Sequence, residues 1–320
     1  MHTQQITGAF YGVAIGDALG VPVEFKTRDY LSSYPITDFT GYGSWNQPPG
    51  TFSDDSSLTF CTAESLLTGY HLSDMAERFV QWYQHGYWGA HHVVFDIGQT
   101  TRLSLQRVAT GTSPLLSGGM EEFENGNGSL MRMMPVALYL AHEPDIHQRY
   151  RIVKEISGIT HLHFRSVLAC FIYVEYLRLL LTTPDPQTAY LQLQTTINHF
   201  LATQSFNPAE VKYFDRLLLQ SVATTDRSQI NSSGYVIHTL ESAIWCLLTT
   251  TSYSECVLKA VNLGGDTDTT GAVAGALAGV CYGQSGIPAT WIQQVARSKD
   301  IAALAHHFMT AINKPATGKS

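Results

Sequence analysis

The chain has 320 residues, of which 44% are hydrophobic and only 14% charged, and its formal net charge is −7. Because average soluble domains carry roughly 25% charged residues, this composition predicts a thick, well-buried core and excludes an intrinsically disordered chain. The negative charge argues against a nucleic-acid binder that relies on a broad basic face. It does not exclude an anionic small ligand, because bound cations or helix N-termini can supply positive charge.

Cysteine spacing and the N-terminus bear on where the protein works. The five cysteines are scattered among apolar neighbours without a C-x-x-C pair, so we expect neither disulfides nor a thiolate metal site, and a reducing cytoplasm fits best. The N-terminal MHTQQITGAFYG lacks the basic-then-apolar layout of a signal peptide. No run of about 18 uncharged apolar residues predicts a membrane span, so we expect no membrane association.

The first predicted element is a helix in GAFYGVAIGDALG, which carries glycines at positions 8, 12, 16 and 20. A spacing of four places them along one slowly drifting stripe of the helix. Each glycine inside a helix costs about 0.8–1 kcal/mol relative to alanine, so the stripe indicates a face that another backbone approaches closely. Asp17 and Glu24 supply carboxylates near the end of this segment.

The next informative segment is GTFSDDSSLTFCTAESLL, in which Ser53, Asp54, Asp55 and Ser56 precede an apolar helix predicted at 57–69. Acidic and hydroxyl side chains at a helix N-terminus are usually plain caps. One cap position needs one side chain, however, and two carboxylates stand here. The pair therefore indicates metal ligation in addition to capping.

A glycine-rich loop follows in ENGNGSLMRMMPVAL (124–138). Consecutive glycines expose backbone N–H groups, and a following helix adds its positive end, which together suit a phosphate. Such a loop is more often only a turn. Pro135 indicates either a kink or the first turn of the helix that follows.

Several later segments have helical spacing: 166–181, 207–221, 238–250 and 253–265. The first is apolar nearly all round, as a central buried helix would be. The second opens with Asn207 as an N-cap and Pro208 at the first helical position. The fourth runs from a Ser254 cap to Gly264, which is typical of a left-handed C-terminal stop.

The last element, NLGGDTDTTGAVAGALAGVCYG (262–283), repeats the first pattern, with Asp266 and Asp268 before glycines at 271, 275, 279 and 283. If the two glycine-striped helices pack at the centre, we expect the acidic helix ends at Asp54–Asp55 and Asp266–Asp268 to converge. Carboxylates that close repel unless cations neutralise them or their pKa values rise. All-oxygen ligands favour Mg²⁺, Mn²⁺ or Ca²⁺ over zinc. An EF-hand would need a glutamate where Leu277 stands.

These elements predict an all-α fold: one compact helical domain over residues 1–313, with a central two-metal site, and a flexible tail at 314–320. Alternating β-branched segments bounded by turn residues are scarce. Tight packing alone also accounts for the glycines, and capping alone accounts for any single acid. Two carboxylates at each helix end are what favour the metal site.

Seven motifs, in this order, resemble those of the ADP-ribosylglycohydrolase family, most closely its dinitrogenase-reductase-activating glycohydrolase branch. They are GAFYGVAIGDALGVPVEF, GTFSDDSSL, FDIGQTTRLSL, GNGSLMRMMPVAL, SGITHLHFRS, SGYVIHTLESAIW and GGDTDTTGAVAGALAG. The match covers nearly the whole chain. The resemblance implies an all-helical orthogonal bundle with two Mg²⁺ or Mn²⁺ ions, which hydrolyses the glycosidic bond of ADP-ribosylated targets, arginine-linked in the close branch.

The resemblance also implies roles for individual residues, carried over by motif. The implied metal ligands are Ser53, Asp54, Asp55, Asp266, Asp268 and Thr269. The implied catalytic carboxylates are Glu24, Asp55 and Asp96. The implied substrate contacts are Asn127, Gly128, Ser129 and Met131 around the distal ribose and pyrophosphate, His161 near a phosphate or ribose, and Tyr235 against adenine.

Two departures and several simpler readings accompany these roles. The usual T-D-D-T is S-D-D-S here, so both hydroxyl ligands lose a methyl group and keep their oxygen. His238 stands where close relatives commonly carry an acid. Asp96 also suits a cap or turn, His161 a solvated loop and Tyr235 a core or interface. Asp17 suits a buried partner for a helix end, and it is not counted as catalytic.

The hypotheses for function belong to two classes. The first is a metal-dependent hydrolase that releases ADP-ribose, with an arginine-linked protein adduct as the expected target and a small ADP-ribosyl metabolite as the alternative. The second is a catalytically silent relative that binds ADP-ribose or serves structurally. We expect a cytoplasmic monomer that binds neither nucleic acid nor membranes.

Overall fold

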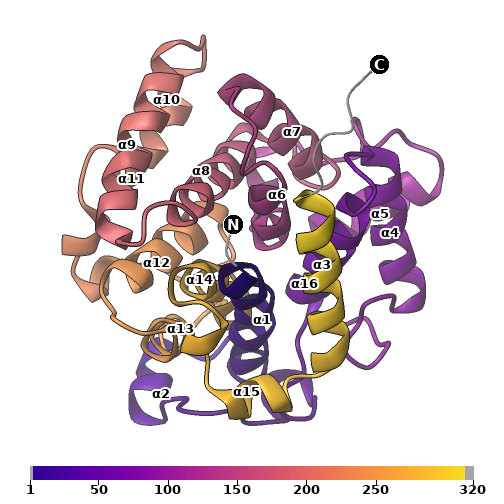
Figure 1. The fold of residues 1–320 in the computed structure, drawn as a ribbon, viewed down its shortest axis with the longest axis vertical. Helices are drawn as coiled ribbons and strands as arrows, with labels where there is room; N and C mark the ends of the chain where they lie inside the picture. Colours follow the sequence, from indigo (N-terminus) through magenta and orange to yellow (C-terminus); the bar gives the residue numbers. More distant parts are fainter. Residues whose placement is uncertain (1–2, 314–320) are drawn as a thin grey trace.

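The computed structural model describes residues 3–313, and their regular structure is helical (Figure 1). The α-helices are α1 (Thr3–Gly20), α2 (Arg28–Ser33), α3 (Asp54–Leu66), α4 (Leu72–His85), α5 (Gln99–Ala109), α6 (Met134–Tyr139), α7 (Ile146–Gly158), α8 (Phe164–Leu180), α9 (Pro186–Ala202), α10 (Pro208–Val211), α11 (Asp215–Leu218), α12 (Val236–Leu248), α13 (Tyr253–Val261), α14 (Thr267–Tyr282), α15 (Ala289–Gln294) and α16 (Ser298–Ile312).

Short 3-10 helices connect several of these elements. They are η1 (Val21–Val23), η2 (Gly43–Trp45), η3 (Glu122–Glu124), η4 (Leu130–Arg132), η5 (Lys212–Phe214), η6 (Val222–Thr224), η7 (Arg227–Gln229) and η8 (Gln284–Gly286). Between residues 3 and 313, β pairing is limited to three isolated bridges. The predicted all-α fold is therefore confirmed. The domain bounds 1–313 stay a prediction, and the tail predicted at 314–320 lies outside the described residues.

Two helices from opposite ends of the chain, α1 and α14, lie side by side at the centre of the molecule (Figure 1). Their glycines face each other in antiparallel order. A Cβ atom added to Gly12 would lie 2.2 Å from the carbonyl oxygen of Gly275, and one added to Gly16 would lie 2.0 Å from that of Gly271. No larger side chain fits at that separation. The predicted packing of the two glycine stripes is confirmed, and we call this contact the glycine seam.

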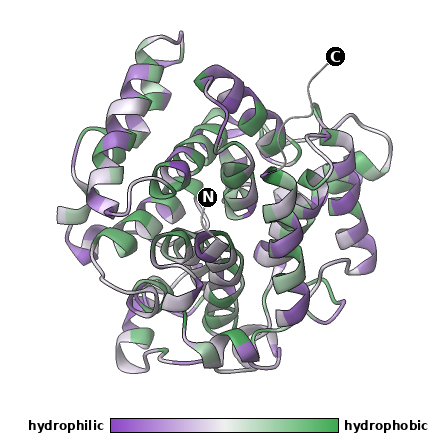
Figure 2. Ribbon diagram, viewed as in Figure 1, coloured by the Kyte–Doolittle hydropathy of each residue, from purple (hydrophilic) through white to green (hydrophobic). Residues whose placement is uncertain are grey.

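Helix α1 is the described segment that bears on the expected absence of a membrane span. By length and composition the stretch Thr3–Val23 could cross a membrane, with a hydropathy of 1.4 over its most apolar window. A search for uncharged runs overlooks it because Asp17 interrupts the apolar residues. In the fold, 94% of that window is buried by the surrounding protein, and the outer helices that cover it carry both hydrophilic and hydrophobic residues (Figure 2).

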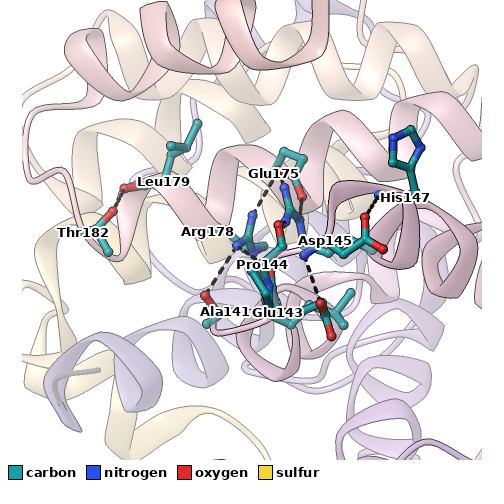
Figure 3. Close-up of polar contacts among 11 residues, drawn as sticks. Ala141, Glu143, Pro144, Asp145, His147, Glu175, Arg178, Leu179 and Thr182 are labelled. Atoms are coloured by element: carbon teal, nitrogen blue, oxygen red, sulfur yellow. Dashed lines mark hydrogen bonds and ion pairs between the residues drawn. The ribbon is translucent and has the colours of Figure 1, made fainter. Parts of the chain in front are cut away.

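Helix α8 is buried on nearly all sides, as its sequence predicts, and it carries one acid into the core. Glu175 is 1% exposed and accepts both donors of a bidentate pair from Arg149 of α7, at 2.7 and 2.8 Å. Arg178 donates to the same carboxylate at 3.0 Å. Arg149 also donates to the carbonyl oxygens of Glu143 and Pro144, so the network fixes the turn between α6 and α7 (Figure 3).

The helix predicted at 207–221 is broken into α10, η5 and α11, so that prediction is wrong in its length. Asn207 does cap the start, since its side chain accepts from the Ala209 N–H, and Pro208 does take the first position. The end comes early because side chains of α9 take the carbonyl groups of the last turn. Gln194 donates to the carbonyl oxygen of Leu217 at 2.9 Å.

Smaller differences concern helix ends. The cap predicted at Ser254 lies two residues earlier, at Ser252, whose hydroxyl accepts from the Glu255 N–H, so the helix begins at Tyr253. Gly264 lies beyond its end with a φ of 78°, as predicted for a left-handed stop. Pro135 stands in the first turn of α6, which decides between the two readings of that residue.

Candidate functional site

The start of helix α3 is fixed by a carboxylate from helix α1. Asp17 is fully buried, and its two oxygens accept from the backbone N–H of Ser53, from that of Ser56 and from the Ser56 hydroxyl, at 2.6–3.0 Å. These are N–H groups that a helix N-terminus leaves without partners. Asp17 is thus the buried partner of a helix end that the sequence suggested, and it sets the position of Asp54 and Asp55.

The acidic ends of α3 and α14 meet at one carboxylate. The Oδ2 atom of Asp55 accepts from the Ser53 hydroxyl at 3.0 Å and from the Thr269 hydroxyl at 3.3 Å. Thr269 lies in the first turn of α14, more than 200 residues away in sequence. The convergence that the glycine seam predicted therefore occurs.

Two groups of acids have ligand-type oxygens within 4.8 Å of one another. One consists of Asp17, Asp55 and Asp268, and the other of Glu24, Asp266 and Asp268. Asp268 belongs to both groups. All of these residues except Asp266, which is half-buried, are shielded from solvent.

Burial and mutual repulsion perturb the acids in one direction. Burial, then the charge of Asp268, raises the pKa of Glu24 to about 9. The same two causes raise the pKa of Asp266 to about 7. Burial first and neighbouring carboxylates second raise the pKa values of Asp54 and Asp55 well above the usual range. A positive charge placed among these groups would relieve the repulsion.

Several oxygens of this cluster have no hydrogen-bond partner although they are buried. They are Oδ1 of Asp55, Oδ1 of Asp266, Oδ2 of Asp268 and Oγ1 of Thr270. Buried polar atoms without partners are rare in folded proteins. The donor set is all oxygen, which suits Mg²⁺, Mn²⁺ or Ca²⁺. The residues present therefore fit one or more divalent cations.

A cavity of about 810 Å³ opens beside the acidic cluster. Its walls include side chains of Glu24, Asp54, Asp266 and Thr269, together with the segment 94–103. This volume falls within the range typical of small-molecule sites, roughly 300–1,000 Å³. The cavity thus gives a ligand direct access to the cluster.

Asp96 lies on the cavity wall in the segment before α5. Its φ is 59°, a left-handed conformation that is uncommon outside glycine. Burial first, and then the neighbouring Asp268 carboxylate, raise its pKa far above the usual value. A strained backbone that points an acid at other acids is a feature of functional sites. The simpler reading of Asp96 as a helix cap is wrong, because the residue at the cap of α5 is Gly98.

The glycine-rich loop forms another part of the cavity wall. Asn127, Gly128 and Met131 line it, and the Asn127 side-chain amide donates to Oδ2 of Asp266 at 2.8 Å. His161 also lines the cavity and is 2% exposed, so it is not a solvated loop histidine.

Two predicted substrate residues lie elsewhere. Ser129 is fully buried and its hydroxyl accepts from the Ser157 hydroxyl at 2.9 Å, so its side chain lies behind the loop. Tyr235 is half-buried at the cap of α12, where its ring packs edge-on against His238, and neither residue lines the cavity. The neighbouring Gly234 does reach the cavity wall.

Two hydrogen-bond partners of the site residues, Trp45 and Arg132, escaped the sequence patterns. The Trp45 indole N–H donates to Oε2 of Glu24. Arg132 is fully buried and donates to the carbonyl oxygen of Gly128 at 2.5 Å and to the Thr160 hydroxyl at 2.9 Å. Burial, then the Arg132 charge, lowers the pKa of His161 to about 3. Nothing in local periodicity marks the contact of Trp45 with Glu24 or that of Arg132 with Thr160, because each joins segments more than 20 residues apart.

Comparison with known proteins gives consistent matches. The family model described as ADP-ribosylglycohydrolase matches residues 2–317. The "ADP-ribosylarginine hydrolase Tri1" of Serratia proteamaculans (strain 568) is 32% identical over 306 residues, which cover 94% of this chain and 78% of the relative. The "ADP-ribosyl-[dinitrogen reductase] glycohydrolase" of Rhodospirillum rubrum is 30% identical over 297 residues, covering 90% and 89%. A solved structure titled "ADP-ribosylglycohydrolase-related protein complex" superposes with a TM-score of 0.80 at 30% identity, covering 97% of this chain and 98% of that one.

Proposed function

The chain belongs to the ADP-ribosylglycohydrolase family, and we propose that it releases ADP-ribose from arginine by hydrolysing the glycosidic bond at the distal ribose. Relatives that are 30–32% identical to the chain carry the names ADP-ribosylarginine hydrolase and ADP-ribosyl-[dinitrogen reductase] glycohydrolase, and they match most of it. The observation that carries the proposal is the buried cluster of carboxylates with unpartnered oxygens beside a ligand-sized cavity. In a protein that does not use the cluster, the repulsion between its carboxylates would lower stability without any gain in function.

The cofactor we propose is a pair of Mg²⁺ or Mn²⁺ ions. The residues that would hold them are Ser53, Asp54, Asp55, Asp266, Asp268 and Thr269. When bound, such ions supply positive charge that orients ribose hydroxyls or a water molecule at the reacting carbon. The support is the all-oxygen donor set and the carboxylates whose pKa values are raised by burial and by one another's charge.

The chain's own carboxylates supply the rest of the chemistry. Glycosidic cleavage passes through a state with positive charge on the ribose ring, which nearby carboxylates stabilise. Glu24 and Asp96 both line the cavity beside Asp268. We assign to this pair the activation of the attacking water and assistance to the leaving guanidine nitrogen, and to Asp55 the anchoring of the cluster.

The glycine-rich loop and its neighbours would hold the rest of the substrate. Asn127, Gly128 and Met131 stand on one wall of the cavity with His161, where backbone N–H groups and a neutral imidazole can face a pyrophosphate or ribose. Arg132 supports the loop from behind through the Gly128 carbonyl group. For Tyr235 we propose an adenine contact only through its proximity to Gly234, which supports that role less directly.

Release assays test this function. The protein is incubated with Mg²⁺ or Mn²⁺ and with arginine-, serine- and nucleobase-linked ADP-ribose, and free ADP-ribose is measured. We expect release from the arginine adduct, loss of release in Asp268→Asn, and retention of the fold in that variant by circular dichroism. Release from none of the substrates by folded, metal-loaded protein would favour the silent-relative alternative. Undiminished turnover by Asp268→Asn would remove the metal cluster from the reaction.

Target and location are the finer parts of the proposal. We propose a protein adduct over a small ADP-ribosyl metabolite, with monomeric and cytoplasmic protein. The five cysteines support a reducing compartment, since all five are free. The formal net charge of −7 supports the proposal that the protein does not bind nucleic acid.

A further inference from the structure

One segment beside the cavity exposes apolar side chains in close succession, and we call residues 115–123 the apolar loop. Leu115, Leu116, Met120 and Phe123 are 51%, 74%, 64% and 86% exposed, respectively. Single exposed apolar residues are ordinary on a protein surface, but a group rimmed by polar residues marks an interaction site.

The apolar loop is held in place by hydrogen bonds on its inner side. The Gly119 N–H donates to the Thr160 carbonyl oxygen at 2.9 Å, and the Gly119 carbonyl oxygen accepts from the Leu162 N–H at 2.8 Å. The Ser117 hydroxyl donates to the Ile159 carbonyl oxygen at 2.8 Å. The polar groups of this segment are therefore hydrogen-bonded to the protein interior, which fixes its backbone while the apolar side chains face solvent.

The turn that carries Phe123 is fixed as well. Glu121 and Glu124 cap η3 reciprocally, with the Glu121 N–H donating to Oε2 of Glu124 at 3.0 Å. Glu122 pairs with Arg165 at 3.1 Å. These contacts fix the turn with the Phe123 ring in solvent. The turn therefore presents a rigid aromatic group of the kind that dominates protein interfaces.

The apolar loop is continuous with the proposed active site. Phe123 and Glu124 line the cavity, and the chain then runs directly into Asn127. If ADP-ribose fills the cavity, the arginine attached to it extends out through the cavity mouth. The surface of the modified protein around that arginine would therefore lie against the rim of the cavity. A free ADP-ribosyl metabolite would have nothing to place against Leu116 or Met120.

We propose that the apolar loop docks the ADP-ribosylated protein itself, through a surface of that protein that is apolar and basic; this inference rests on the proposed function. The charge argument is that three acids, Glu121, Glu122 and Glu124, surround Phe123 in the sequence, with Arg165 paired to Glu122, on a chain of net charge −7. A second copy of this chain would oppose the same acids in a two-fold contact, which disfavours self-association. Anionic lipid surfaces are disfavoured for the same reason.

The test compares two substrates of one reaction: dinitrogen reductase that carries ADP-ribose on arginine, and free ADP-ribosyl-arginine. The variant is Leu116→Ser with Met120→Ser, since neither residue lines the cavity. The matched control is Leu191→Ser with Leu219→Ser, two exposed leucines that lie in α9 and at the end of α11. Urea midpoints establish that both double variants fold like the parent protein.

We expect kcat/KM on the modified protein to fall at least about tenfold in the loop variant, the usual effect of truncating interface anchors, with the rate on free ADP-ribosyl-arginine within about twofold. The control should change neither rate. Equal effects on both substrates, or no effect on either, would overturn the docking role. The docking role would also be overturned if light scattering shows that the parent protein is a dimer, that the loop variant is a monomer, and that both rates are unchanged. Absence of release from both substrates by the parent protein would instead refute the proposed function.

Discussion

Substitution of Gly20 by alanine tests whether the glycine seam sets the geometry of the acidic cluster. A Cβ atom added to Gly20 would lie 2.3 Å from the backbone nitrogen of Asp268 and 2.4 Å from its Cα atom. Ordinary contact begins near 3.4 Å, so α1 and the start of α14 must separate by about 1 Å. Both partners are backbone, and neither can rotate away.

Two effects follow from that displacement. Overpacking of this kind typically costs about 1–3 kcal/mol of unfolding free energy, which exceeds the gain of about 0.8–1 kcal/mol from alanine in a helix. Asp268 also moves relative to Asp55, and a 1 Å misplacement at a reacting site can lower the rate by about 10²-fold. We therefore expect Gly20→Ala to be less stable and to bind Mn²⁺ at least about tenfold more weakly.

The assay combines urea unfolding, calorimetric titration with Mn²⁺ and release of ADP-ribose. Gly12→Ala is the matched control, because its Cβ atom would meet Gly275 at 2.2 Å in the same seam, two helical turns from Asp268. It should lose similar stability and retain more of its affinity for Mn²⁺. Parental stability and parental Mn²⁺ affinity in Gly20→Ala would refute the reasoning.

Three further outcomes follow from individual contacts. Asn127→Ala removes the donor to Asp266, so Mn²⁺ affinity by calorimetry should fall about 10–100-fold, as for other partners of metal ligands; unchanged affinity would show that the amide does not position this acid. Arg149→Met leaves Glu175 with Arg178 as its remaining ionic partner, and urea unfolding should show a loss of about 3 kcal/mol with kcat retained; a loss below about 1 kcal/mol would contradict a structural role for the pair. Burial and the Arg132 charge lower the pKa of His161 to about 3 in the folded protein. As pH falls below about 6.5, His161 is therefore protonated in the unfolded chain but stays neutral in the folded protein, which lowers the free energy of unfolding. His161→Gln should therefore lose less stability than the parent between pH 6.5 and pH 4, by up to about 3 kcal/mol; identical pH profiles would exclude a buried neutral imidazole.

Periodic features of the sequence predicted the centre of the fold well. Glycines four residues apart form a helical stripe, and their cost indicates a close neighbour, so local rules predict that the two stripes pack together. The register that pairs Gly12 with Gly275 is known from the structure. That packing indicated that the acid pairs Asp54–Asp55 and Asp266–Asp268, each at the start of an apolar helix, converge. That is why Asp55 and Thr269, far apart in the chain, were expected in one site.

Contacts between irregular segments were not predictable in the same way. Trp45 reaches Glu24 from a 3-10 turn, and Arg132 reaches Thr160 from inside the core, and neither position has a period that would reveal its partner. The end of α11 depends on Gln194 of α9, a tertiary contact that overrides the local helical pattern. The exposure of Met120 likewise depends on the hydrogen bonds of Gly119.

Diffraction from crystals grown with Mn²⁺, recorded at the manganese absorption edge, tests the central claim most directly. We predict anomalous peaks bounded by Asp54 and Asp55 on one side and by Asp266 and Asp268 on the other, next to the cavity. A map without a peak among these four carboxylates at saturating Mn²⁺, or with its peaks only at surface acids, would contradict the proposal that distant acids meet to hold divalent ions.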